Sequence, residues 1–391
     1  MSRRKIFVVI RILVFAALIA LLWRQVQLRD RITILEDGRD VTLYGTVVDE
    51  TPEQTIFKTD SGVIRLVSSE ILKERPHYGL LSLVKRLDLS DFGVAILCMA
   101  GTYLINVLRW YLLCRARNLG LTPRNATRFT LLGLFFNNAV PGATGGDVMK
   151  AYLASQDLPS KAPMVASVFL DRIIGLIALI CLAGGVLVFQ LGDPAFQSFA
   201  TNVFLLLGAI VVVGIIYYSR RLRRILGLTY IGSKLPFKGM IHKLDQGFFE
   251  YRYHKNSLLV AFAISFVAHG FTMLSHIMIG KALRMDVPIV AYFIYVPIGQ
   301  VASALPIFPG GWGVREATYG ILFQRAGVPL SHGVALGFLH GFVVLGWSLL
   351  GGLLFLRGTR DIPATSMDEI LESPREGSAE PGPAGPKDDG A

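Results

Sequence analysis

Two stretches rich in proline and glycine each carry an acid and a base beside an interrupted apolar segment. Residues 137–150 read NNAVPGATGGDVMK, and residues 304–316 read ALPIFPGGWGVRE. Non-helical backbone is tolerated at membrane depth only where protein or a water-filled cavity satisfies its polar groups. Inverted-repeat transporters use such breaks to aim the N-termini of half-helices at an anionic substrate near the midplane. The pattern indicates a site for a negatively charged group, and the alternative is that the breaks only shape a packed bundle.

The candidate site residues are the amides, acids and bases around these breaks, with one arginine from the apolar segment between them. The candidate substrate-binding residues are Asn137, Asn138, Asp147, Lys150, Arg172, Arg315 and Glu316. The backbone breaks are assigned to Pro141, Gly142, Gly145, Gly146, Pro309, Gly310, Gly311 and Gly313. Asp147 and Lys150, three residues apart, are expected to share one helix face.

Asp171 and Arg172 lie inside the apolar run 163–189. A charge at such depth costs at least ~2.5 kcal/mol on insertion scales, so a partner or a wet cavity is expected. Adjacent helical residues point about 100° apart, which makes these two poor partners for each other. Arg172 is expected to contact Asp147, Glu316 or a lipid phosphate, and a purely structural ion pair is the alternative.

Motifs of familiar enzymes are missing from the sequence. It contains no phosphate-binding loop of the GxxxxGK[ST] type, no nucleophile elbow and no His-Glu-x-x-His pair. We therefore predict no catalytic residue, no metal and no cofactor. The alternative is a membrane-embedded glycosyl- or acyl-transferase that acts on a lipid carrier, with Asp147 or Glu316 as its base.

The composition places these motifs in a membrane protein. Of the 391 residues, 52% are hydrophobic and only 17% are charged, whereas soluble domains carry about 25% charged residues. Long apolar runs, each near the length that crosses a bilayer, cover 6–23, 92–113, 163–189, 202–218, 257–280, 288–308 and 331–356. We predict an all-α polytopic integral membrane protein with about six spanning helices and two re-entrant Pro/Gly-broken hairpins, or up to eight spans.

Loop charges orient the helices. Segments 114–128 and 219–256 are strongly basic, whereas 190–198 contains an acid and no base. The positive-inside rule then places both basic loops, and both chain termini, in the cytoplasm. Residues 129–155 must enter and leave the membrane from inside, and 288–325 from outside. The predicted location is the bacterial inner membrane. Although the net charge is +11, nucleic acid is excluded as a partner of the protein.

Four regions divide the predicted chain. Residues 1–24 form a signal anchor, 25–90 a small external β-rich insertion, 91–357 the membrane domain and 358–391 a disordered cytoplasmic tail. In the insertion, strands are predicted at 41–48, 55–58 and 63–67, with a hairpin turn at 60–62. An insertion of this size is marginal as an independent fold, so it is expected to lean on the membrane or on an envelope protein.

The motifs resemble a known family. Residues 137–152, 168–172 and 308–316 look like the flippase-like membrane proteins, the family of the transmembrane region of lysylphosphatidylglycerol synthase. The resemblance covers roughly 91–357. It maps the family's Pro-Gly-x-x-Gly-Gly-Asp motif and its basic residue onto Pro141–Lys150, the arginine of the next helix onto Arg172, and the Pro-Gly-Gly-x-Gly-x-x-Glu motif onto Pro309–Glu316.

The resemblance implies a lipid-handling function. In the full-length synthase the membrane region is implied to move an aminoacylated lipid between leaflets, while a C-terminal soluble domain uses aminoacyl-tRNA. Since this chain ends in a short tail, lysyl transfer is not expected, and the insertion at 25–90 departs from the family pattern. We predict a non-enzymatic flippase-like protein that binds or translocates an anionic phospholipid or polyprenyl-phosphate lipid, with a non-catalytic envelope subunit as a further alternative.

Overall fold

The computed structural model describes residues 29–358 except 37–38, 52, 60, 69–71, 73–75, 77, 140–144, 157, 159, 220, 222–244 and 305–308. The predicted signal anchor, the tail beyond residue 358, and the break residues Pro141 and Gly142 therefore lie outside the described residues.

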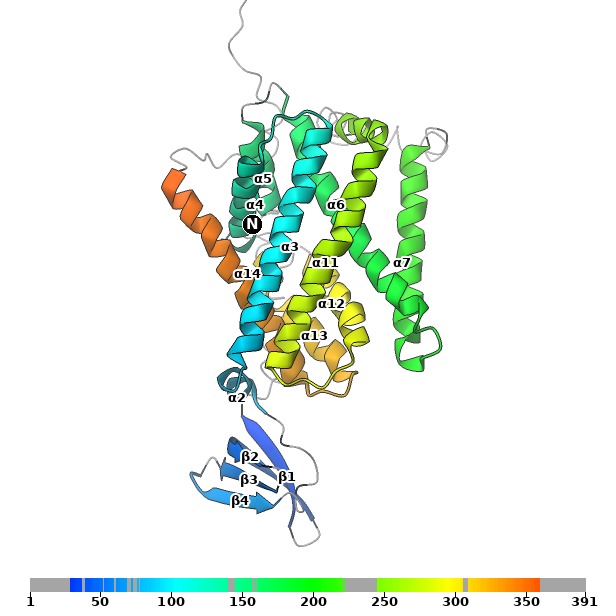
Figure 1. Ribbon diagram of the computed structural model, residues 1–391. Coiled ribbons are helices and arrows are strands. Elements are labelled where there is room, and N and C mark those ends of the chain that lie inside the picture. Colours follow the sequence, from blue (N-terminus) through cyan, green and yellow to red (C-terminus); the bar gives the residue numbers. More distant parts are fainter. Residues whose placement is uncertain are drawn as a thin grey trace, which may run out of the picture.

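Long apolar helices form the body of the protein (Figure 1). Five described helices have the length and composition to cross a membrane: α3 (Leu89–Ala116), α6 (Ala162–Val188), α7 (Pro194–Tyr218), α11 (Lys255–Ala282) and α14 (Leu330–Gly358). At 1.5 Å per residue even the shortest exceeds the ~30 Å hydrocarbon core of a bilayer. Their outward faces are apolar, as at Leu205 on α7 and Leu97 on α3, which are 67% and 70% exposed. Such faces fit a lipid environment.

Two helical hairpins enter this bundle from opposite ends. The first pairs α4 (Pro123–Ala139) with α5 (Gly145–Ser155), and the second pairs α12 (Ile289–Ser303) with α13 (Val314–Gln324). Figure 1 shows α4 and α5 in the upper half and α12 and α13 in the lower half. The longest of these four helices, α4, extends only about 26 Å, which is shorter than the ~30 Å hydrocarbon core of a bilayer. The predicted pair of re-entrant hairpins is confirmed, and the alternative of eight spans is not needed.

The turn of the second hairpin depends on glycine. Gly310, Gly311 and Gly313 have φ angles of 62°, 70° and 81°, a region that side chains with a Cβ rarely adopt. Gly310 and Gly311 lie within the short 3-10 helix η2 (Pro309–Gly311), and Gly313 directly precedes α13. The glycines therefore reverse the chain at the tip and set the start of α13.

The N-terminal insertion is a four-stranded antiparallel meander. Its strands are β1 (Asp30–Glu36), β2 (Arg39–Glu50), β3 (Gln54–Thr59) and β4 (Ile64–Ser68), hydrogen-bonded in the order β1-β2-β3-β4. The three predicted strands are present as β2, β3 and β4. The first strand was missed, although Ile32 and Ile34 alternate and pair with Leu43 and Val41 of β2.

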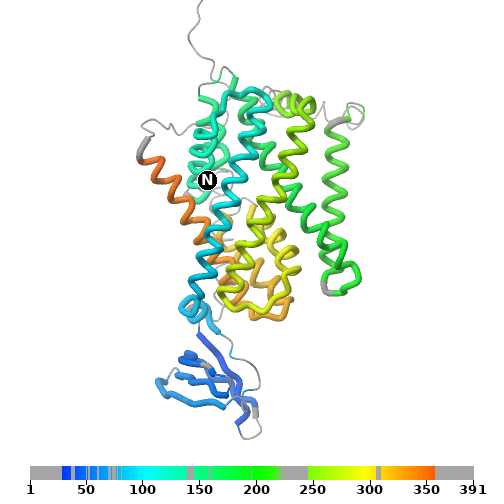
Figure 2. The backbone as a smooth tube through the Cα atoms, in the orientation of Figure 1, coloured from blue at the N-terminus to red at the C-terminus, as the bar shows by residue number. Residues whose placement is uncertain are grey.

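The sheet leans on the membrane domain of its own chain. The buried carboxylate of Asp30 accepts hydrogen bonds of 2.7 Å from the backbone N–H groups of Val47 and Gly79. Gly79 precedes a short helix, α2 (Leu80–Lys85), and the hydroxyl of Ser331 on α14 donates to the carbonyl of Tyr78 at 3.0 Å. Figure 2 follows the chain from the sheet through α2 into α3. The support expected for this small fold comes, at least in part, from these contacts.

Replacing Gly146 with alanine is expected to destabilise the first hairpin. A Cβ at this position would lie 1.9 Å from the carbonyl oxygen of Gly133 on α4, a backbone atom that cannot move aside alone. Overpacking of this kind costs about 1–3 kcal/mol, and more where backbone must shift. Thermal unfolding of the purified protein measures the loss. Gly208→Ala on α7, where a Cβ meets nothing within 4 Å, is the matched control, and an equal fall in both variants would contradict this packing.

Candidate functional site

The end of α4 in the first hairpin lies against the turn of the second hairpin. A Cβ built on Gly310 would lie 2.5 Å from the side-chain oxygen of Asn138, so the end of α4 touches the turn of the second hairpin. Each tip also begins a half-helix, α5 or α13. The side chain of Asn137 accepts a hydrogen bond from the N–H of Gly146 at 3.0 Å, and Glu316 accepts one from the N–H of Gly313. The two half-helix N-termini therefore lie at the inner ends of the hairpins.

Arg172 forms an ion pair with Asp147. The guanidinium Nε lies 2.6 Å from the carboxylate of Asp147 in the first turn of α5, so the structure selects one of the three partners that the sequence left open. Arg172 lies ten residues after the start of α6, about 15 Å along the helix. Its side chain is 50% exposed, whereas that of Asp147 is 14% exposed. The arginine is therefore held by one carboxylate but remains accessible from outside the protein.

The neighbouring Asp171 points the other way, into a buried cluster. Its carboxylate accepts from Nε of Arg109 on α3 at 2.7 Å, and Nη1 of Arg109 also donates to the hydroxyl of Ser265 on α11 at 2.9 Å. The two charged side chains are only 7% and 10% exposed. This cluster joins three spanning helices. Sequence reasoning did not single out Arg109, although an arginine within an otherwise apolar run was a usable signal.

Lys150 is a buried cation without an acidic partner in the described part of the chain. Its ammonium lies 3.8 Å from the centre of the Trp110 ring, and the residue is 6% exposed. Trp110 is fixed by a hydrogen bond of 3.1 Å from its indole to Ser167. A cation over an aromatic face gains electrostatic energy from the ring, but its charge is not neutralised.

Arg315 and Glu316 satisfy each other at the second tip. They are adjacent in sequence, yet Nη2 of Arg315 lies 2.7 Å from the carboxylate of Glu316. Nε of Arg315 donates to the carbonyl of Gly337 on α14 at 3.0 Å, and its guanidinium lies 5.1 Å from the Trp312 ring centre. Both residues are at most 5% exposed. These two candidates are both paired and buried, whereas Arg172 is paired with Asp147 but half exposed.

The charges between the two ends of the bundle do not balance. In the described helices we count four cations there, Arg109, Lys150, Arg172 and Arg315, against three carboxylates, Asp147, Asp171 and Glu316. The masked tip residues 140–144 and 305–308 contain no charged residue. Because uncompensated charge is costly in a bilayer, the excess of one cation favours an anionic ligand.

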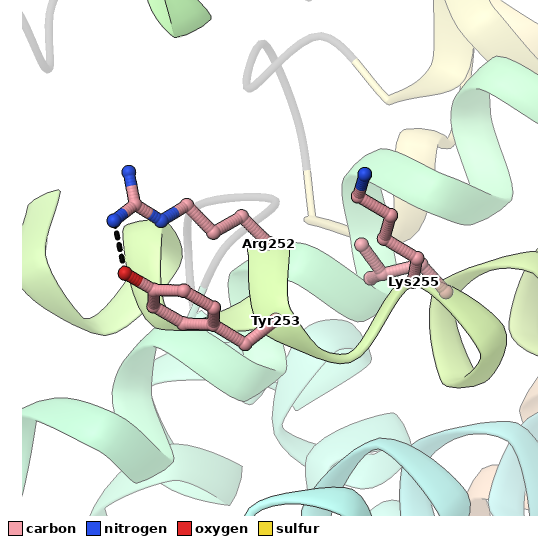
Figure 3. Close-up of a pocket in the computed structure, with 4 residues that line it drawn as sticks. Arg252, Tyr253 and Lys255 are labelled. Atoms are coloured by element: carbon pink, nitrogen blue, oxygen red, sulfur yellow. Dashed lines mark hydrogen bonds between the residues drawn. The ribbon is translucent and has the colours of Figure 1, made fainter.

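A second basic region lies at the bundle end where α3 finishes and α11 begins. A cavity of about 510 Å³ is lined by Arg252, Tyr253, Lys255 and Leu258 (Figure 3). In Figure 3 the guanidinium of Arg252 bonds to the hydroxyl of Tyr253, and Lys255 lies apart from this pair. A separate cavity of about 380 Å³ is lined by Leu112, Arg115, Ala116, Asn256, Ser257 and Val260. The sequence predicted a basic loop here but no cavity.

Comparisons with known proteins agree with the membrane fold. The family profile described as "Lysylphosphatidylglycerol synthase TM region" matches residues 78–352, well over half of the chain. The UPF0104 membrane protein PH1989 of Pyrococcus horikoshii is 24% identical over 310 residues, which cover 73% of this chain and 92% of the relative. No solved structure matches. This polytopic membrane protein therefore belongs to the lysylphosphatidylglycerol synthase TM region family.

Proposed function

We propose that the membrane domain binds the phosphate of an anionic lipid at Arg172 and carries that lipid between the leaflets. The observation that carries the proposal is the Arg172–Asp147 pair: among the deep cations of the described helices, Arg172 alone combines an ion pair with a half-exposed side chain. A phosphate group offers the same acceptor oxygens as a carboxylate and takes bidentate hydrogen bonds from arginine. It can therefore replace Asp147 without leaving the guanidinium unpaired.

The charge balance supports an anion over a neutral lipid. The deep arginines are each paired with a carboxylate, whereas Lys150 has no carboxylate partner in the described residues. One added negative charge would offset this excess cation. A phosphodiester or a polyprenyl phosphate carries such a charge. A zwitterionic headgroup would bring a second cation into the same region, and its binding would be weaker.

The opposed hairpins suggest how the lipid would move. The contact between Asn138 and Gly310 lies between a hairpin from one end of the bundle and a hairpin from the other. If either hairpin swings away from this contact, the Arg172 region opens toward one membrane face only. Repeat-built transporters work by such alternating access around a fixed site.

The state of the two acids supports transport over lipid-linked group transfer. A general base needs an available carboxylate within reach of the proton that it removes. Asp147 is paired with Arg172, and Glu316 is paired with Arg315 and with the N–H of Gly313. We therefore keep the proposal non-enzymatic, in the bacterial inner membrane, with the basic end of the bundle and both termini in the cytoplasm.

The N-terminal sheet offers a surface for a partner protein on the side of the membrane opposite the cytoplasm. One face of the sheet exposes Tyr44, Ile64 and Leu66, which are 53%, 64% and 65% exposed, and β4 is an edge strand among the described strands. Apolar edge strands readily accept another chain. An envelope protein in this place would crosslink to photoreactive groups at positions 64 and 66, and a failure to crosslink any protein in intact cells would remove this part of the proposal.

Mass spectrometry of co-purified lipids tests the function. Wild-type protein is expected to retain one class of phosphate-bearing lipid above its abundance in the membrane, and Arg172→Gln is expected to lose that enrichment. Loss of a charge-assisted hydrogen bond costs about 1.5–3 kcal/mol, a weakening of about ten- to a hundredfold. Arg284→Gln, outside the deep region, serves as the control. Equal enrichment in wild type and Arg172→Gln would remove Arg172 from the site.

A further inference from the structure

Two histidines from different spanning helices stack on each other beside the second hairpin. The rings of His276 on α11 and His340 on α14 have centroids 4.1 Å apart and planes at 32° to each other. Tyr319 of α13 completes the cluster, with its hydroxyl 3.2 Å from Nε2 of His276. His276 and Tyr319 are 0% exposed and His340 is 5% exposed. Ionisable groups inside a membrane protein are expensive and mark functional sites, and lipid binding at Arg172 gives these three no role.

The hydrogen bonds of His276 determine which of its ring nitrogens carries hydrogen. Nδ1 lies 2.8 Å from the carbonyl of Thr272, and because a carbonyl only accepts, Nδ1 must be the N–H group. In the neutral ring Nε2 is then an acceptor, and the hydroxyl of Tyr319 donates to it. The neutral ring of His276 therefore has a partner at both nitrogens.

The same atoms can hold one further proton without leaving His276 or Tyr319 unpaired. The hydroxyl of Tyr319 also lies 3.4 Å from the carbonyl of Val296 on α12. When a proton binds Nε2 of His276, this nitrogen donates to the tyrosine oxygen. The hydroxyl hydrogen then turns to the Val296 carbonyl, so the hydrogen bond between the two side chains reverses its direction.

Only one of the two stacked rings is suited to carry the added charge. Nδ1 of His340 is buried and has no hydrogen-bond partner among the described residues, so a charged His340 would leave a buried N–H group unsatisfied. Two charged rings 4.1 Å apart would also repel each other strongly at low dielectric. The pair therefore takes one proton, and His276 carries it.

Tyr319 links the second hairpin to the spanning helices. A Cβ on Gly299 of α12 would overlap the Tyr319 ring, and one on Gly337 of α14 would lie 3.3 Å from it. Together with the hydrogen bond to His276, these contacts join α13 to α11, α12 and α14 at a single side chain. A change in the partner of the Tyr319 hydroxyl is therefore felt where the hairpin attaches to the bundle.

A fixed cation lies close to the histidine pair. The guanidinium of Arg315 fills the space beside Gly341, the residue after His340, and it interacts electrostatically with both histidines. A proton on His276 adds a second cation, whereas Glu316, which is paired with Arg315, can offset only one. The last three turns of α6 carry no charged residue. The other titratable groups that face this region are Tyr319 of α13, Tyr103 of α3 and Tyr292 of α12.

We propose that His276 and His340 form a proton-binding site that couples the position of the second hairpin, and through it the movement of the lipid, to protons. Without the added proton, Tyr319 holds α13 against α11. When one proton from the aqueous phase binds Nε2 of His276, the tyrosine hydrogen bond reverses, the new cation repels Arg315, and the hairpin moves away from α11. A charged imidazole is better solvated where water reaches it, so acid favours the moved hairpin and base favours the described position. Proton binding does not require transport; only its coupling to lipid movement rests on the proposed function.

Nitrogen NMR of the full chain, labelled with nitrogen-15 at histidine, tests the site. At about pH 8 wild type is expected to show a histidine with hydrogen on Nδ1 that becomes charged as the pH falls to about 4, a range around the ordinary histidine value of ~6.5. His276→Gln is expected to lose this signal. His269→Gln, which removes another histidine of α11 whose Nε2 bonds to the carbonyl of Gly175, is expected to keep it. The proposal is wrong if no such histidine titrates in wild type, or if the signal survives in His276→Gln.

Distances between two spin labels test the movement of the hairpin. Ile321 on α13 and Leu274 on α11 are 52% and 41% exposed, and each lies two residues from a member of the cluster. As the pH falls, the distance is expected to lengthen in wild type and in His269→Gln and to stay constant in His276→Gln. Thermal unfolding at each pH checks that the fold is retained. An equal change in all three proteins, or a change in none, would mean that the histidine pair does not control the hairpin.

Lipid movement in vesicles separates a failure of this proposal from a failure of the proposed function. With fluorescent phosphatidylglycerol as the probe, wild type is expected to be faster under a pH difference of about one unit than at equal pH, by up to the about tenfold bias that one proton receives. His276→Gln is expected to have the same rate in both conditions. Equal wild-type rates that still require Arg172 would overturn the coupling and leave the proposed function standing. If no protein moves the lipid, but His276 titrates and the hairpin moves, the proton site stands and the proposed function fails.

Discussion

Replacing Asp171 with asparagine is expected to lower the free energy of unfolding of the membrane domain by about 3–5 kcal/mol. The change leaves the guanidinium of Arg109 without its carboxylate, at a position where the side chain is 7% exposed and where only Ser265 remains as a charge-neutral partner. A cation stranded in this way keeps its desolvation cost and loses the attraction that offset it. Because Arg109 connects α3, α6 and α11, the loss should affect the whole bundle.

Two further variants show whether stability depends on the ion pair itself or only on leaving neither of its charges unpaired. Arg109→Met/Asp171→Leu removes both charges and keeps apolar volume, so it is expected to recover much of the stability lost in Asp171→Asn, as buried pairs replaced by hydrophobic residues often do. Asp147→Asn, whose partner Arg172 is half exposed, should cost less than about 1 kcal/mol of stability. Unfolding in graded denaturing detergent ranks the variants. A larger loss in Asp147→Asn than in Asp171→Asn would contradict the assignment of the Arg109 pair as structural and the Arg172 pair as accessible.

Asp147→Asn is expected to have an effect on lipid binding opposite to that of Arg172→Gln. In the protein as described, Asp147 occupies Arg172 at 2.6 Å and competes with an incoming phosphate. Removing the carboxylate frees the guanidinium and adds a second excess cation to the deep region, so the phosphate should bind about tenfold more tightly. Translocation should nevertheless slow, because the ion pair between Asp147 and Arg172 can no longer re-form when the lipid leaves. Arg172→Gln should instead lose both binding and translocation.

Lipid retention and transport rate, measured on the same preparations, check this pair of variants. Asp147→Asn with more lipid retained and a lower rate supports competition at Arg172. Two variants that both lose lipid would mean that Asp147 holds the site open or contacts the headgroup itself. Asn202→Asp, which alters a polar residue on the peripheral helix α7, controls for general effects of charge changes in a membrane helix.

The large features of the fold were predictable because each leaves a local pattern. Apolar runs of the right length gave the spanning helices, and loop charges required the two hairpins to return to the side from which they entered. The glycines at 310, 311 and 313, all with positive φ, mark the second turn in the sequence itself. The pairing of Arg172 with Asp147 was one of three stated partners, since few deep acids were available.

What the sequence did not reveal depends on distant contacts. Arg109 and Asp171 are 62 residues apart, and nothing local indicates that α3 and α6 bring them together. Lys150 was expected to share a helix face with Asp147, and nothing local indicates that its ammonium lies over Trp110 of α3. Arg315 and Glu316 were predicted as substrate-binding residues, which stays a prediction, and the sequence did not indicate that they pair with each other beside Gly337 of α14.

Lipid movement across a reconstituted bilayer tests the central claim most directly. Purified wild-type, Arg172→Gln and Gly208→Ala proteins in phosphatidylcholine vesicles would receive a trace of fluorescent phosphatidylglycerol, and its accessibility to a membrane-impermeant quencher would be followed over time. We predict that wild type and Gly208→Ala equilibrate the probe between leaflets, and that Arg172→Gln, although folded, moves it at least about tenfold more slowly. Equal rates for wild type and a folded Arg172→Gln would contradict transport through Arg172.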